Sequence, residues 1–145
     1  MKREMNSASL MLVGDLILDQ PDPHSFFAPS RELLRSADLA IGHVEVPHTN
    51  RGVEQSTDIP APPANPDHLA ALLDAGFGAI TLAGNHINDS GAAGIEGTVA
   101  TLRGLGIATA GAGMNIAAAR EPVIAVRQGV RIGVLSYNCV GPRES

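Results

Sequence analysis

The stretch FGAITLAGNHINDSG, residues Phe77–Gly91, is the most informative part of this chain. Its first six residues are an apolar run of the length of a buried strand, and a segment with helical apolar spacing follows it. The polar residues therefore stand at the carboxyl end of a strand, the edge where open α/β sheets bind ligands. Asn85, His86 and Asp89 offer an amide oxygen, an imidazole and a carboxylate, which can hold a divalent metal or move a proton. They would equally suit a polar turn whose Asn and Asp cap the next helix.

Length and composition describe one globular domain. The chain has 145 residues, of which 44% are hydrophobic and 17% charged, and with only 3% aromatics its core must be aliphatic. A net charge of −5 without a Lys/Arg cluster disfavours nucleic acid as a partner. No run approaches the ~20 apolar residues of a membrane helix. The amino terminus lacks the apolar core of a signal peptide, so we expect a cytoplasmic location.

The single cysteine excludes an internal disulfide framework. Cys139 lies just past an apolar, strand-like run. We therefore expect a buried, inert thiol.

Alternating apolar runs and helix signals predict an α/β fold with a mixed sheet. Leu69, Leu72 and Leu73 are expected to face the core from the helix that starts after Asn65. Two apolar runs flanking Gln128-Gly129 have the pattern of a β-hairpin. The other predicted elements are strands over 9–13, 38–47, 77–82 and 107–110, helices over 66–76 and 92–104, and shorter helical segments near 31–35 and 115–120.

Polar residues also end two other predicted strands. Asp15 follows the first strand, and His43 and Glu45 alternate with apolar residues in the second. Because parallel strands share one carboxyl edge, we expect these side chains to converge with Asn85 and His86. Carboxylates with Asn and His suit Mn²⁺, Fe or Zn²⁺; Glu45 could bridge two metals, and His86 could protonate a leaving group. The alternative for His43 and Glu45 is an edge strand with one solvated face.

A proline-rich segment, residues 48–66, interrupts the pattern of strands and helices. A structureless loop longer than ~15 residues in a compact domain is usually functional or disordered, and we expect it to face the substrate near Glu45. His48 and His68 are expected at the surface, and His48 is the candidate substrate-binding residue.

Four motifs occur in order along residues 9–140: Gly14-Asp15, Ala37–Pro47, Ala83–Gly91 and Gly111–Asn115. Together they resemble the CapA family, named for poly-γ-glutamate capsule biosynthesis. The resemblance implies a calcineurin-like metallophosphatase fold, a layered α/β sandwich. It also implies roles for single residues: metal-site positions at Asp15, Glu45 and Asn85, a catalytic imidazole at His86 and a supporting carboxylate at Asp89. His43 is a further candidate metal ligand, because it alternates with Glu45 on one face of the strand.

The chain differs from the family in two respects. The family usually has Asn-Leu-Glu where this chain has His43-Val44-Glu45, so the cofactor is expected to be a divalent metal (Mn, Fe or Zn) or none. The family also continues beyond this length and supplies further histidines, whereas all five here lie within residues 1–86. We therefore expect residues 1–145 to be the amino-terminal part of one domain, about half of the fold. That part would need its carboxyl-terminal half for completion and would expose an apolar sheet face alone.

Three functions are compatible with the resemblance. The first is a CapA-type enzyme that acts on a peptide or polyglutamate-like substrate by metal-assisted hydrolysis, with His86 as acid or base. The second is a metal-independent peptide epimerase, like soluble relatives linked to lasso-peptide biosynthesis, which moves a proton at a backbone carbon. The third is a non-catalytic component of capsule assembly, for which a net charge of −5 disfavours holding an acidic polymer without metal.

Overall fold

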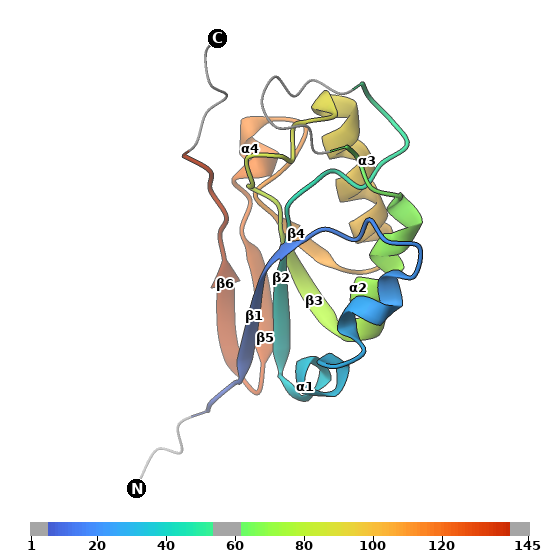
Figure 1. The fold of residues 1–145 in the computed structure, drawn as a ribbon. Helices are drawn as coiled ribbons and strands as arrows, with labels where there is room; N and C mark the ends of the chain where they lie inside the picture. Colours follow the sequence, from blue (N-terminus) through green and yellow to red (C-terminus); the bar gives the residue numbers. More distant parts are fainter. Residues whose placement is uncertain (1–5, 54–61, 140–145) are drawn as a thin grey trace, which may run out of the picture.

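The computed structural model describes residues 6–53 and 62–139 (Figure 1). The central part of the predicted 48–66 loop, residues 54–61, lies outside the described residues.

A parallel four-stranded sheet organises the chain. Its strands are adjacent in sequence order: β1 (Leu10–Leu16), β2 (Leu39–Val44), β3 (Phe77–Thr81) and β4 (Ala108–Ala110). A separate antiparallel pair consists of β5 (Val123–Arg127) and β6 (Val130–Val134). The predicted α/β class is confirmed, with the parallel and antiparallel pairs in two sheets rather than in one.

Helices cover one face of the parallel sheet and the hairpin lies on the other (Figure 1). Strand residues alternate between these faces: Ala40 and Val44 of β2 pack into the helix-side core, and Leu39 and Ile41 pack with Val123 of β5. The helices are the 3₁₀ turns η1 (Pro23–Phe27) and η2 (Pro66–Leu69), and the α-helices α1 (Arg31–Ser36), α2 (Ala70–Ala75), α3 (Gly91–Gly104) and α4 (Ile116–Ala119).

Local sequence signals explain where η2 and α2 begin and end. The Asn65 side chain accepts a hydrogen bond from the Asp67 backbone N–H at 3.0 Å, and Gly76 ends α2 with φ +97°. Leu69 and Leu72 are buried as predicted, but the prediction for Leu73 is wrong, because it is 49% exposed. The buried face of α2 consists of Ala71, Leu72 and Ala75, and Leu73 lies outside it.

The β5–β6 hairpin has the predicted turn. Gln128 and Gly129 have φ +50° and +73°, the two positive values of a type I′ turn. Beyond β6 the sequence prediction fails at Cys139, which is exposed. The strand ends at Val134, so the thiol lies outside the layer that the hairpin buries.

The exposure of β1 and the character of the helices describe the surface of the protein. β1 is an edge strand, and its Leu10 and Leu12 are 46% and 73% exposed. Within the described residues, no helix is both long and apolar enough to span a bilayer.

Candidate active site

His86 and Asp89 form a hydrogen-bonded pair in the loop between β3 and α3. Nδ1 of His86 lies 2.7 Å from Oδ2 of Asp89, and the two side chains are 21% and 10% exposed. A carboxylate only accepts, so Nδ1 carries the proton and donates it in this bond. Nε2 of His86 has no hydrogen-bond partner among the described residues. Proton exchange with a ligand would therefore take place at Nε2.

The local sequence creates this pair. The backbone N–H of Asp89 donates to the carbonyl of His86 at 3.0 Å, which closes a turn with the two side chains three residues apart. Between them, Ile87 is buried in the core on the helix side of the sheet. An apolar anchor inside a polar turn thus fixes the orientation of both functional side chains.

His43 is the second imidazole at this edge. The predicted alternation is confirmed, because His43 and Glu45 are half-buried while Val44 and Val46 are buried. Nδ1 of His43 lies 3.0 Å from the Thr81 hydroxyl, which its parallel register places opposite on β3. On the other side of the ring is Gly84, where a Cβ atom would lie 2.8 Å from Nε2.

Asp15 occupies a β-bulge at the end of β1. Val13 pairs with Gly42 and Leu16 with Val44, so β1 has one residue more than β2 across this interval. Asp15 has φ +41°, a left-handed conformation that Asp tolerates better than most residues. Bulges re-aim side chains, and here the exposed carboxylate is turned out at the carboxyl end of the sheet.

The three loops at this edge are held together by glycine and serine. The Ser136 hydroxyl, past β6, accepts a hydrogen bond from the Ala83 backbone N–H at 3.2 Å. Gly111, with φ +95°, packs so closely that a Cβ atom there would lie 2.8 Å from the Ala83 nitrogen. The motif starting at Gly111 thus supports the loop that carries His86.

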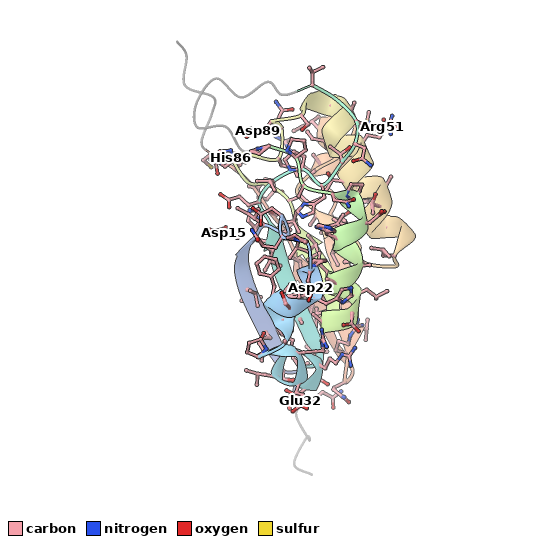
Figure 2. The ribbon with its side chains drawn as sticks, turned by 45° about the vertical axis from the view of Figure 1, so that its right-hand side comes forward. Asp15, Asp22, Glu32, Arg51, His86 and Asp89 are labelled. Atoms are coloured by element: carbon pink, nitrogen blue, oxygen red, sulfur yellow. The ribbon has the colours of Figure 1, made fainter. Side chains whose placement is uncertain are left out.

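The predicted convergence is only partly realised. His86 and Asp89 lie toward one end of the molecule, Glu32 lies at the opposite end, and Asp15 lies between them, below His86 (Figure 2). Glu45 is half-buried and Asn85 is exposed at the same edge, but no hydrogen bond or ion pair within the described residues joins them to Asp15 or His86.

The predicted metal ligands do not by themselves form a metal site in the described residues. In residues 6–53 and 62–139, no group of three or more His, Cys, Asp or Glu is placed to hold a metal ion. Asp15, His43, Glu45 and Asn85 therefore do not form part of such a group within the described residues, and their role as metal ligands stays a prediction.

The prediction that His48 is a surface, substrate-binding residue is wrong. Its side chain is 0% exposed. Nδ1 lies 3.0 Å from the Val46 carbonyl and Nε2 accepts from the Leu18 N–H at 3.3 Å, so both ring nitrogens are used inside the protein. Burial lowers the pKa of His48 to about 4, which keeps the imidazole neutral.

The cause of this burial is the glycine face of α3. Gly94 and Gly97 leave space that Thr49 fills, and a Cβ on Gly52 would overlap the carbonyl of Ser90. The segment after β2 therefore packs along α3. His68 is half-buried, and its Nδ1 lies 2.7 Å from the Leu18 carbonyl, so the surface position expected for it is also only partly correct.

A shallow apolar groove of about 390 Å³ adjoins the site, between the two sheets. It is lined by residues from β1, β2, β3 and the β6 end, among them Gly14, Gly42, Thr81 and Val134. Thr81 connects this groove to His43. The sequence did not reveal Thr81, because it looks like part of an apolar run and its register with His43 is set only by the pairing of β2 with β3.

The fold and this edge define the class: a layered α/β protein of the metallophosphatase-like kind, with its polar site where the parallel strands end. The chain belongs to the family of bacterial capsule synthesis proteins, PGA_cap, whose sequence model matches residues 9–144. The resemblance to the CapA family is thereby confirmed. No curated protein matches the chain at a significant level.

Proposed function

We propose that the protein is a capsule-synthesis-family enzyme that cleaves a peptide or poly-γ-glutamate-type substrate, with His86 as its acid/base group. The observation that carries this proposal is the 2.7 Å bond from Nδ1 of His86 to the largely buried Asp89. The carboxylate holds the ring in one orientation and keeps a proton on Nδ1, which leaves Nε2 to exchange protons with the substrate.

Hydrolysis of an amide then has a simple balance. Nε2 of His86 takes a proton from a water whose oxygen adds to the carbonyl carbon, and it gives that proton to the departing nitrogen as the carbon–nitrogen bond breaks. The products are one carboxylate and one amine. A divalent metal of the Mn, Fe or Zn kind stays a separate proposal, because the described residues offer no group of three or more His, Cys, Asp or Glu to hold it.

The same His86–Asp89 pair supports a second function. A peptide epimerase needs a base and an acid at a backbone carbon and no metal, and His86 would supply one of the two groups. The partner group is not identified among the described residues.

The test compares His86→Gln with His24→Gln. His24 is a matched control, because its Nδ1 also contacts an aspartate, Asp74, at 3.3 Å, but it is 49% exposed and lies on η1. The substrate probe is an oligo-γ-glutamate peptide incubated with the protein. We expect amine release that His86→Gln abolishes and His24→Gln leaves intact.

Deuterium uptake at the peptide α-carbon in heavy water, with a chelator present, would instead identify the epimerase. Hydrolysis at the wild-type rate in His86→Gln would overturn the role of His86. Absence of both reactions in the wild type would favour the third function, a non-catalytic component of capsule assembly.

A further inference from the structure

The ring of His43 is held on both sides by protein atoms. Nδ1 faces the Thr81 hydroxyl at 3.0 Å, and Nε2 faces the backbone of Gly84, where a Cβ atom would come within 2.8 Å. Thr81 and His43 are direct neighbours in the parallel register of β2 and β3, both half-buried on the face toward the hairpin. The contact therefore depends on the sheet itself and not on a mobile loop.

The hydroxyl of Thr81 determines which ring nitrogen carries the proton. It donates to the Gly42 carbonyl at 3.2 Å, and a carbonyl can only accept. A hydroxyl has one proton to give, and with that proton on the Gly42 carbonyl its oxygen can only accept from His43. In this arrangement Nδ1 is the N–H nitrogen of the neutral ring and Nε2 holds the lone pair.

We propose that Thr81 is a positioning residue that locks His43 in the Nδ1–H tautomer, so that the Nε2 lone pair is presented at the carboxyl edge of the sheet beside Gly84. There it can accept a proton or a hydrogen bond from a ligand, or bind a cation. That a ligand uses this lone pair rests on the proposed function of this edge. The tautomer of His43 does not depend on that function.

The arrangement parallels the one at His86. Each imidazole has Nδ1 committed to a protein acceptor, the Thr81 hydroxyl for His43 and Asp89 for His86, and each has Nε2 without a hydrogen-bond partner among the described residues. His48 is different, because both of its ring nitrogens are bonded inside the protein. In the described part of the chain, His24 and His68 also have only Nδ1 bonded, to Asp74 and to the Leu18 carbonyl. What distinguishes His43 and His86 is that they lie at the candidate site.

The experiment measures the tautomer directly by ¹⁵N NMR of the histidine rings, at a pH where His43 is neutral. Three proteins are compared: wild type, Thr81→Ser, which keeps the hydroxyl, and Thr81→Val, which has nearly the same shape without it. The His48 ring is an internal reference for folding, since it is fixed by Leu18 and Val46 and not by Thr81.

We expect the wild type and Thr81→Ser to have an unprotonated Nε2 on His43, and Thr81→Val to gain the Nε2–H form while the His48 signals stay in place. A wild-type His43 with its proton on Nε2 would overturn the proposal, and this measurement needs no variant to fold. An unchanged His43 tautomer in Thr81→Val would also overturn it. Neither result depends on hydrolysis, so failure of the proposed function would be recognised separately.

Discussion

The backbone N–H of Leu18 donates a hydrogen bond to Nε2 of His48 at 3.3 Å, although the two residues are 30 positions apart. The same Leu18 offers its carbonyl to Nδ1 of His68 at 2.7 Å. Leu18 is 1% exposed, so both of its backbone polar groups are buried and both are satisfied by an imidazole. Two histidines thus hold the loop that follows Asp15 and β1 against the end of β2 and the start of η2.

This burial makes stability depend on pH. The folded-state pKa of His48 is lowered to about 4 from 6.5, chiefly by desolvation, with the neighbouring His68 acting in the same direction and the Val46 carbonyl and Asp19 opposing it. A lowered pKa on a base means that the unfolded chain binds the proton first. The neutral His48 therefore contributes fully to the free energy of unfolding above about pH 6.5, and this contribution is lost as the pH falls to about 4.

We expect the wild type to lose on the order of 3 kcal/mol of unfolding free energy across that window through this group. Urea unfolding at several pH values measures it. The control is His48→Gln, whose stability should be lower at pH 7 but should fall less steeply toward pH 4. Parallel slopes for the two proteins would contradict the assignment.

Asp89→Asn tests the orientation of His86. The amide can donate as well as accept, so it no longer forces the proton onto Nδ1 at the 2.7 Å contact. We expect kcat for the proposed hydrolysis to fall by roughly 10²- to 10⁴-fold with little change in fold. Steady-state kinetics measures kcat, and circular dichroism checks the fold. Full activity in this variant would show that Asp89 has no role in the proposed reaction.

Gly84→Ala tests the space beside His43. The new Cβ would lie 2.8 Å from Nε2, and the ring cannot swing freely because Thr81 holds Nδ1. We expect a cost of about 1–3 kcal/mol and a displaced His43. Gly104→Ala is the control, since a Cβ there meets nothing within 4 Å and should be neutral or stabilising by up to about 1 kcal/mol. Equal melting temperatures for the two variants would be evidence against a tight contact at Gly84.

Two substitutions at Asp15 separate backbone strain from charge. Asn also tolerates the left-handed conformation at φ +41°, whereas β-branched Val does not. We expect Asp15→Asn to keep the thermal stability and Asp15→Val to lose about 1–2 kcal/mol. Thermal unfolding decides this, and a loss of similar size in both variants would mean that the carboxylate, not the bulge, is the stabilising feature.

The order of strands and helices was predictable because each element has its own signal. Apolar runs mark β1 to β4, Asn65 and Gly76 bound the segment from η2 to α2, and Gln128-Gly129 marks the hairpin turn. The position of the candidate site was predictable from the same signals, because parallel strands end at one edge of a sheet. That edge was expected to carry Asp15, His43 and His86, although the contacts between them could not be predicted.

Contacts between distant segments were not predictable. His48 looked like a surface residue because it begins a proline-rich segment, and nothing local reveals that the glycines of α3 would receive that segment. The hydroxyls of Thr81 and Thr98 were missed for a similar reason. Each matters only through its partner, His43 for Thr81 and the His48 backbone for Thr98, which lie 38 and 50 residues away.

The exposure of Cys139 gives the protein a ready attachment point. It is the one thiol in the sequence, so a maleimide-linked fluorophore or nitroxide would label a single known position without mutagenesis. The label would be three residues from Ser136, whose hydroxyl contacts Ala83 in the loop leading to His86. A change in its emission or line shape on adding a peptide would report how that loop responds to a ligand before any product has been identified.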